Sequence, residues 1–298
     1  MKNKLPDSSA HRNNQRYRHL TAVLSVLALL ACYSGTTTAL ADDFRTFGVE
    51  VTNDDNLSRA QNGPGKKGSA GISGSYALGN RKQLSDTSSL TRLYNFNAAY
   101  YSSYSGYSNA SAEAQYIYKK KTGLGPKAWW WSGGGNLGYA LYSDGNRSNF
   151  YFDGDLSAGR RFGERWEFSA AYVMDVASAN ESVYSVSGHG PKVSVDFIAG
   201  DRWLIYATWK NRGGDSWMAD VSSPYPLNEK ASLNPDGTFG GWAYRVDTTT
   251  TETTLGANFV LDEQSSIDFS YLKRDVLVKN TTNWYYNNIY SVSYVRNL

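Results

Sequence analysis

The stretch WEFSAAYVMDV, residues 166–176, decides the fold. Every second residue from Trp166 to Val176 is apolar, and the residues between them include Glu167 and Asp175. Successive side chains of an extended strand point to opposite faces, so a period of two gathers the apolar residues on one face. The stretch therefore predicts a β-strand with one apolar face and one polar face.

The same alternation recurs in eleven other segments. They are residues 47–52, 70–78, 94–100, 110–118, 129–141, 150–158, 193–197, 203–209, 255–261, 267–271 and 286–294. A tilted strand needs about nine to eleven residues to cross a bilayer, and bacterial membrane barrels have an even number of strands. The pattern predicts an all-β fold, a closed antiparallel transmembrane β-barrel of about 12 strands, over residues 42–298.

The links between these segments alternate in length. Those at 162–165, 200–201 and 262–264 are short, whereas those at 53–67, 177–191, 212–242 and 275–283 are long. Short periplasmic turns and long extracellular loops are typical of outer-membrane barrels. Because proline interrupts a β-ladder, we expect all prolines after residue 41 to lie in links or at the first residue of a strand. These prolines are Pro64, Pro126, Pro191, Pro224, Pro226 and Pro235.

Aromatic residues gather at two levels of the predicted strands, as expected for the two interfacial belts of a membrane protein. Near the short links lie Phe162, Trp166, Trp129, Trp131, Trp203, Tyr118 and Tyr294. Near the long links lie Tyr100, Phe150, Trp209, Tyr271 and Tyr286. A soluble β-sandwich or barrel is the alternative, because alternation alone does not say which face points inward.

Residues 1–41 have the pattern of a secretory signal peptide. Five basic residues precede an uncharged apolar stretch at 20–33, and a segment of small residues ends at Ala39-Leu40-Ala41. We expect cleavage before Asp42. Two alternatives remain: a membrane-anchoring helix, and lipidation at Cys32 in the sequence Leu29-Leu30-Ala31-Cys32.

Removal of this segment changes the charge balance. The whole chain carries a formal charge of +3, but residues 42–298 hold 25 Lys and Arg against 26 Asp and Glu. Nucleic acid is therefore not an expected partner, because binding it requires a surplus of positive charge. Cleavage also removes Cys32, which is the only cysteine, and with it any disulfide or thiol chemistry.

Three motifs carry a resemblance to known proteins: VEVTNDDN at 49–56, GLGP at 123–126 and GRRFGERW at 159–166. With them, the chain resembles bacterial outer-membrane β-barrel proteins, and most of all the porin-like proteobacterial barrels of about twelve strands. The resemblance implies a bacterial outer-membrane location, contact with outer-membrane lipid and lipopolysaccharide, and recognition by the assembly machinery. The final alternating strand fits that recognition, although the last residue is Leu298 rather than an aromatic residue.

The polar face of the strands is the candidate pore lining. Its charged residues are Glu113, Asp153, Asp155, Glu167, Lys192, Asp196, Arg202, Lys210, Glu252 and Asp268. Opposed charges create a transverse field across a water-filled passage, which suits ions or small polar solutes. The alternative is a network of ion pairs that closes the interior. We therefore predict a porin-like channel, with a non-conducting scaffold or receptor barrel as the alternative.

The link at 212–242 is long enough to be functional. We expect it either to fold into the mouth and narrow the pore, or to remain an extracellular loop.

Enzymatic activity is the competing class. Residues 42–298 contain one histidine, His189, which we expect at the base of a long loop, at a depth suited to lipid hydrolysis. Outer-membrane phospholipases pair His with Ser as His-x-Ser, and here Gly190 and Pro191 follow the histidine instead. We expect no enzyme, no cofactor and no metal site, because Asp153 and Asp155 alone are too sparse to form a calcium cage. The sequence does not indicate the oligomeric state.

Overall fold

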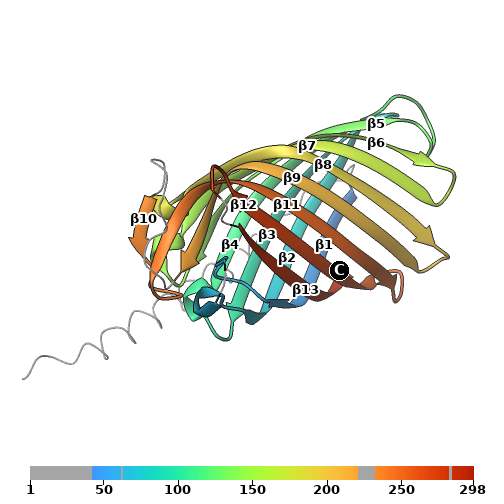
Figure 1. The fold of residues 1–298 in the computed structure, drawn as a ribbon. Helices are drawn as coiled ribbons and strands as arrows, with labels where there is room; N and C mark the ends of the chain where they lie inside the picture. The colour runs from blue at the N-terminus through green and yellow to red at the C-terminus, as the bar shows by residue number, and fades with distance from the viewer. Residues whose placement is uncertain (1–41, 62, 221–231, 282–283) are drawn as a thin grey trace, which may run out of the picture. The chain divides into compact units, whose positions relative to one another are not determined.

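The structure is a computed structural model that describes residues 42–61, 63–220, 232–281 and 284–298 (Figure 1). Twelve long strands of 13 to 19 residues form it: β1 (Asp42–Asp54), β2 (Ser69–Ser85), β3 (Ser88–Tyr101), β4 (Asn109–Lys121), β5 (Trp130–Tyr142), β6 (Asn149–Phe162), β7 (Trp166–Ala179), β8 (Val186–Ala199), β9 (Trp203–Asp220), β11 (Trp242–Val260), β12 (Ser265–Val278) and β13 (Trp284–Asn297). No helix in the described part of the chain is long and apolar enough to cross a membrane. The expected signal peptide lies outside the described residues and stays a prediction.

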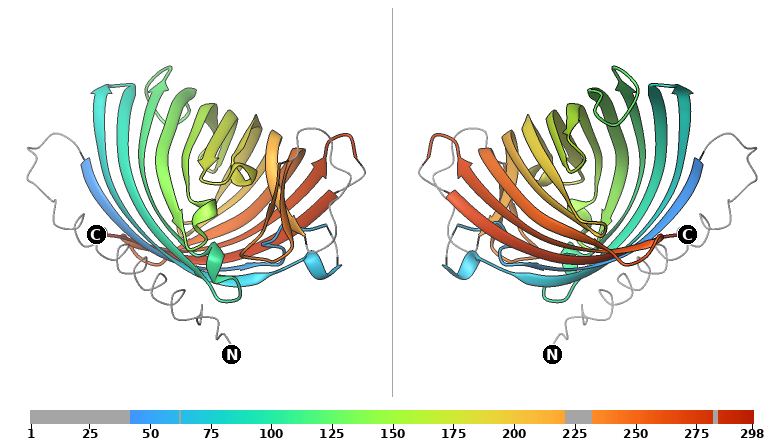
Figure 2. Two further views of the ribbon diagram at one scale, coloured as in Figure 1. Left: turned by 90° about the vertical axis from the view of Figure 1, so that its left-hand side faces the viewer. Right: turned by 90° about the vertical axis from the view of Figure 1, so that its right-hand side faces the viewer.

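The strands form one closed antiparallel barrel. Each long strand pairs with its neighbour in the chain, and β9 pairs directly with β11. Closure comes from β1 and β13, which pair from Thr46 with Asn297 to Asp54 with Ile289. Figure 1 shows these first and last strands, in blue and red, side by side, and Figure 2 shows the strands running obliquely around the barrel. The prediction of a closed barrel of about 12 strands is confirmed.

The connections at the two ends of the barrel differ in part as the sequence predicts. At one end, β2–β3, β6–β7, β8–β9 and β11–β12 are joined by turns of two to four residues, whereas residues 122–129 join β4 to β5. The connections at the other end contain four short 3-10 helices: η1 (Gly63–Gly65), η2 (Ser105–Tyr107), η3 (Gly145–Arg147) and η4 (Ser182–Tyr184). Asp42 and Asn297 both lie at the short-turn end. In an outer-membrane barrel this end faces the periplasm.

Side-chain hydrogen bonds hold the short turn between β11 and β12. The Asp262 carboxylate accepts from the Ser265 hydroxyl at 2.6 Å and from the backbone N–H groups of Gln264 and Ser265 at 2.8 Å. These donors, the Ser265 hydroxyl first among them, hold the pKa of Asp262 below its usual range. The exposed carboxylate therefore stays charged as a fixed cap on the turn.

The apolar rows of the strands point outward. Large apolar side chains that remain more than two-fifths exposed include Phe47, Val51, Ile72, Tyr94, Leu137, Leu156, Phe168, Tyr172, Val193, Ile205, Leu255, Phe269 and Val292. A soluble barrel buries such rows in its interior, whereas a membrane barrel presents them to lipid. The exposed apolar exterior therefore separates the membrane barrel from its soluble alternative.

The aromatic belts also face outward. Near the short turns, Trp129, Trp131, Phe162, Trp166 and Trp203 are 42–50% exposed. Near the long connections, Tyr100, Phe150 and Trp209 are 42–64% exposed. Aromatic rings at these two levels match the headgroup regions on either side of a bilayer.

Three expectations about the links are wrong. Residues 177–191 are not a long loop, because β7 continues to Ala179 and β8 begins at Val186. Pro191 consequently lies inside β8, where the pairing of β8 with β9 lapses between His189 and Lys192. Proline has no N–H to donate, which accounts for this gap in the ladder. Pro235 is also misplaced by the prediction, since it is the last residue of a short strand, β10 (Ser232–Pro235).

Most of the described residues in the predicted link at 212–242 belong to strands. β9 extends to Asp220 and β11 begins at Trp242, and the two pair along this extension. β10 pairs with the other edge of β11. Residues 221–231, which include Pro224 and Pro226, lie outside the described residues. The hairpin thus projects beyond the neighbouring strands at the long-connection end.

Candidate functional site

Two tyrosines brace the interior of the barrel. Tyr151 on β6 lies across Gly138 on β5, where a Cβ would collide with its ring. Its hydroxyl donates to Glu113 on β4 at 2.9 Å. Asn95 and Asn136 donate to the same carboxylate at 2.7 and 2.9 Å. Glu113 is therefore a structural anchor with its acceptors engaged.

The second brace has the same design in a different part of the wall. Tyr206 on β9 lies across Gly256 on β11, again where no Cβ fits. Its hydroxyl donates to Asp268 on β12 at 2.8 Å. In both braces a glycine on the middle strand lets the ring reach an acid two strands away.

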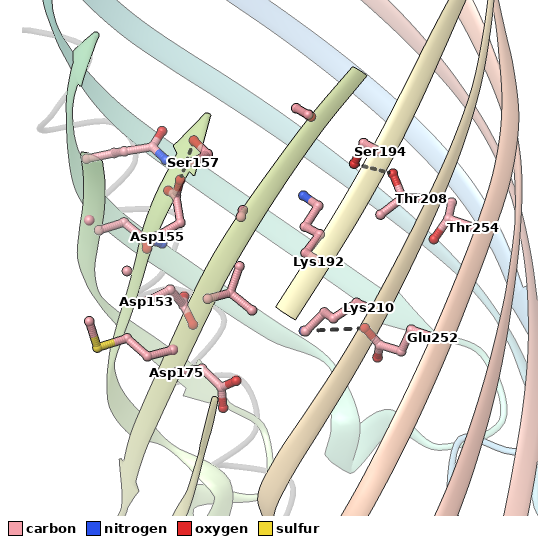
Figure 3. Close-up of a pocket in the computed structure, with 18 of the residues that line it drawn as sticks. Asp153, Asp155, Ser157, Asp175, Lys192, Ser194, Thr208, Lys210, Glu252 and Thr254 are labelled. Carbon is pink, nitrogen blue, oxygen red and sulfur yellow. Dashed lines mark hydrogen bonds and ion pairs between the residues drawn. The ribbon is translucent and has the colours of Figure 1, made fainter. Parts of the chain in front are cut away.

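The interior of the barrel contains a cavity of about 560 Å³, here called the inner cavity. Its charged lining residues are Asp153, Asp155, Asp175, Lys192, Lys210 and Glu252. Figure 3 shows the three aspartates on one side of this space and the two lysines on the other. The aspartates come from β6 and β7 and the lysines from β8 and β9. Carboxylates and ammonium groups thus face each other across this cavity, and the transverse field stays a prediction.

Part of that charge is neutralised by ion pairs. Glu252 accepts from Arg274 Nε at 2.7 Å and lies 3.3 Å from Lys210 Nζ. Arg212 donates to both carboxylate oxygens of Asp175, at 2.7 and 2.5 Å. A bidentate pair of this kind fixes both side chains in one geometry. These five residues form a rigid charged layer across the wall.

Three charged groups of the inner cavity lie outside these pairs. Among the described residues, no oppositely charged group lies within 4.0 Å of Asp153, Asp155 or Lys192. Asp155 accepts a hydrogen bond from Ser157 at 3.1 Å, which leaves its charge in place. Two carboxylates and one ammonium are thus available to a solute.

A second cavity of about 480 Å³, the mouth cavity, lies towards the long connections. Its lining includes Tyr107, Tyr184 and Trp217, which belong to that end of the chain's fold. Asp153, Asp175, Lys210 and Glu252 line both cavities. The two spaces therefore meet at the charged layer.

The mouth cavity is bordered by a cluster that we call the mouth cap. It is the main apolar core of the described residues and consists of Leu57, Val183, Tyr184, Trp217, Ala219, Phe239 and Ala243, with Tyr101, Tyr104, Tyr107, Ala179 and Val186 packed against them. Its members come from four separate connections and the strand ends beside them. Trp217 and Phe239 flank the 221–231 segment, so the hairpin does pack against the other loops. Whether it narrows a pore stays a prediction.

One buried cation ties the mouth cap together. The Arg147 guanidinium lies 4.0 Å from the ring centroid of Tyr184 and 4.4 Å from that of Trp217. Its Nη2 donates to Asp236 at 2.6 Å, and the two side chains are 3% and 0% exposed. Asp144 lies 3.5 Å from Arg147 Nε. Burial among these groups raises the pKa of the Tyr184 hydroxyl.

The remaining predicted pore residues lie nearer the short turns. Glu167 on β7 accepts from Trp130 Nε1 at 3.1 Å and from Arg161 at 3.3 Å. Asp196 on β8 is the register partner of Glu167 and shares its face. Arg202 lies in the exposed turn before β9, at the end of the wall rather than in either cavity.

The contacts of some site residues have no signal in the sequence. Arg147, Asp236, Tyr151 and Tyr206 take their roles from contacts with residues far along the chain. Alternation does place Trp130 on the inner face, between Trp129 and Trp131, as it does Tyr151 and Tyr206. Trp130 lines the inner cavity, and the Lys119 ammonium lies 4.0 Å from its ring centroid.

His189 lies within β8 and not at the base of a long loop, so that expectation is wrong. Its exposed side chain points to the outer surface, where Nδ1 and the Tyr172 hydroxyl form a hydrogen bond of 2.5 Å. No serine in the described part of the chain hydrogen-bonds to it. The geometry of a serine nucleophile activated by histidine is thus not formed.

Comparisons with known proteins place the fold. No protein-family model matches the chain, and no curated protein matches it. Among solved structures, it is similar to the COG4313 outer membrane channel from Pseudomonas putida F1, with 14% identity, 89% of this chain and 98% of the other covered, and a TM-score of 0.55. The NanC porin gives 10% identity, coverage of 86% and 100%, and a TM-score of 0.43.

LpxR from Salmonella typhimurium gives 10% identity, coverage of 83% and 99%, and a TM-score of 0.40. The fold is thus that of a porin-like outer-membrane barrel. The protein is located in the bacterial outer membrane.

Proposed function

We propose that the protein is a channel through which ions and small polar solutes diffuse passively across the outer membrane. The observation that carries the proposal is the pair of adjoining polar cavities inside one closed barrel, joined at Asp153, Asp175, Lys210 and Glu252. Ionisable groups inside a membrane protein are costly to bury and are found along solute paths. The channel likeness of the fold is consistent with this function.

The charges of the inner cavity predict which ions the channel prefers. The side chains that line the inner cavity carry four negative charges, on Asp153, Asp155, Asp175 and Glu252, and two positive charges, on Lys192 and Lys210. A narrow polar passage with surplus negative charge concentrates cations. We therefore expect cations to pass more readily than anions.

The mouth cap sets the condition for conduction. Tyr107, Tyr184 and Trp217 of the cap line the mouth cavity, so a solute that enters from this end passes beside the cap or displaces it. The Arg147–Asp236 pair holds loops from opposite parts of the chain together. We infer that the cap limits how often the channel is open.

Planar-bilayer recording of the refolded protein without residues 1–41 tests the proposal. Under a salt gradient we expect discrete conductance steps and a reversal potential biased towards cations. The double variant Asp153→Asn/Asp155→Asn should keep the steps and lose most of the bias. An inserted barrel that never conducts, with or without its cap residues, contradicts the channel and favours the non-conducting scaffold or receptor barrel.

Lipid hydrolysis is the other alternative, and the geometry favours it less. The hydrogen bond of His189 goes to a tyrosine hydroxyl on the outer surface, not to a serine. Contacts with lipopolysaccharide and with the assembly machinery stay predictions.

A further inference from the structure

We propose that the inner cavity binds a small zwitterionic solute of the amino-acid type, with its ammonium group towards Asp153 and Asp155 and its carboxylate towards Lys192. The inference rests on the proposed channel and names the class of solute that the channel favours. Three features support it: the unpaired charges, their spacing, and the neutral surfaces around them.

The unpaired charges lie on different strands and have opposite signs. Asp153 and Asp155 are on β6, and Lys192 is on β8. Elsewhere in the charged layer, each acid already contacts a base: Asp175 contacts Arg212, and Glu252 contacts Lys210 and Arg274. The acids of the layer therefore already have partners within the protein. Asp153, Asp155 and Lys192 have no oppositely charged partner within 4.0 Å among the described residues, so they attract the charges of a solute more strongly.

The intervening strand keeps the two signs apart. By register, β7 places Ala171 beside Lys192 and Val173 beside Asp155. Neither side chain carries a charge that neutralises the groups next to it. Lys192 is level with Ser157 on β6, two residues along the strand from Asp155. Two inter-strand spacings and this offset place the backbones of Lys192 and Asp155 about 12 Å apart. Two charge-assisted hydrogen bonds of about 2.8 Å each leave room between them for one small solute.

A solute with a single charge can form an ion pair either with the aspartates or with Lys192, but not with both. A cation placed at the aspartates is repelled by Lys192, and an anion placed at Lys192 is repelled by the aspartates. A zwitterion presents the matching charge to each side at once. Figure 3 shows Lys192 and the aspartates projecting into the same space from opposite sides.

Neutral groups complete the cavity. The hydroxyls of Ser194 and Thr208 hydrogen-bond to each other at 2.9 Å beside Lys192. Trp130 contributes a fixed ring, held by Glu167 and stacked under Lys119. A polar wall with one aromatic surface accommodates the small side chain of an amino acid without adding another charge requirement.

Four solutes of similar size separate the possibilities: alanine, lactate, alaninamide and lactamide, which are zwitterionic, anionic, cationic and neutral. Their entry into proteoliposomes that contain the refolded protein is followed by swelling under isosmotic conditions. We expect alanine to enter about fivefold faster than lactamide, the gain that corresponds to one partly exposed ion pair.

Two variants assign the effect to residues. Asp153→Asn/Asp155→Asn and Lys192→Gln should each remove the advantage of alanine while lactamide enters at the wild-type rate. Lactamide entry also shows that each variant has folded and inserted. Lys82→Gln, at an exposed end of β2, is the matched control and should change nothing.

The outcomes distinguish the inference from the function on which it rests. Equal entry of alanine and lactamide through the wild-type barrel overturns the zwitterion site and leaves the channel standing. An advantage that persists in both variants overturns the assignment to these residues. Failure of all four solutes to enter, together with absence of conductance, overturns the channel itself.

Discussion

Replacement of Arg147 by Met tests the role of the mouth cap. The substitution keeps an extended side chain among the rings of Tyr184 and Trp217 but removes the charge that neutralises Asp236. The Asp236 side chain is fully buried, so its carboxylate is left without its cation. We expect the cap to open more often, because opening lets water solvate that carboxylate.

The structure sets the size of the effect. Removal of one partner from a buried ion pair costs about 3–5 kcal/mol. The other carboxylate oxygen of Asp236 keeps hydrogen bonds from the N–H groups of Thr238 and Phe239 at 2.8 and 3.0 Å, which favours the lower end of that range. At about 1.4 kcal/mol per tenfold change, 3 kcal/mol increases the population of the open cap by about 100-fold.

Cysteine labelling measures this population directly. Residues 42–298 contain no cysteine, so Ala177→Cys introduces a single thiol, which lines the mouth cavity beneath the cap. A membrane-impermeant thiol reagent reaches it only through the mouth when the other end is sealed in an intact cell. When reclosing is faster than labelling, the labelling rate follows the open population. Arg147→Met should therefore raise this rate by about 100-fold.

A double variant and a control make the result specific. Arg147→Met/Asp236→Leu removes both charges, and replacement of a buried pair by apolar groups is often neutral or stabilising. Labelling should then return towards the wild-type rate. Arg165→Met, in an exposed short turn at the opposite end, should have no effect. A wild-type rate in Arg147→Met, or rapid labelling of the unaltered barrel, refutes the view that this pair closes the mouth.

Two further predictions concern the barrel wall. Glu252→Gln removes the carboxylate that neutralises Lys210 and Arg274. The reversal potential should then shift towards anion preference, because two positive charges face the passage. A shift towards cation preference would contradict the pairing. Gly256→Ala places a methyl group against the ring of Tyr206 and should cost about 1–3 kcal/mol. Urea titration of the folded barrel, followed by gel mobility, should show the lower unfolding midpoint, and an unchanged midpoint would argue against the brace.

The wall of the barrel was predictable because membrane strands obey a local rule. Alternation in segments such as 166–176 fixes both the strand and the face that meets lipid, and each segment signals independently of the others. Even the inward position of Trp130 follows from its two outward neighbours. Closure of the ring by β1 and β13 then needs only the count of strands.

The ends of the strands were less predictable. Apolar alternation stops where the wall leaves the lipid, but hydrogen bonding between strands continues beyond it. β9 and β11 pair as far as Asp220 and Trp242. The prediction places His189 and Pro191 in a loop for the same reason. β8 begins at Val186, but its apolar row begins only at Val193. A pattern that reports lipid contact underestimates strand length.

The candidate site divides in the same way. Alternation placed Asp153, Asp155 and Lys192 on the inner face, and the inner cavity contains all three. The same rule gives no information about pairing across strands. Glu113 and Asp268 carry the same sign as Asp153, yet they serve as acceptors for Tyr151 and Tyr206. Whether a carboxylate braces the wall or faces a solute depends on partners that only the register supplies.

The mouth cap shows why the contacts between loops could not be predicted from the sequence. The exterior of the wall faces lipid and its interior is polar, and the buried apolar side chains of the described residues form two clusters, one where the loops meet and one on β9, β11, β12 and β13. Arg147 and Asp236 are separated by 89 residues, and each lies among small and polar neighbours that give no periodic signal. Their contact exists only after the ring closes and brings the loops together. Arg147 and Asp236 lie in connections rather than in the strands of the wall, so we expect the stability of the cap to change without loss of the wall. If the barrel conducts as proposed, this separation predicts that a single ion pair regulates access to the interior while the wall stays intact.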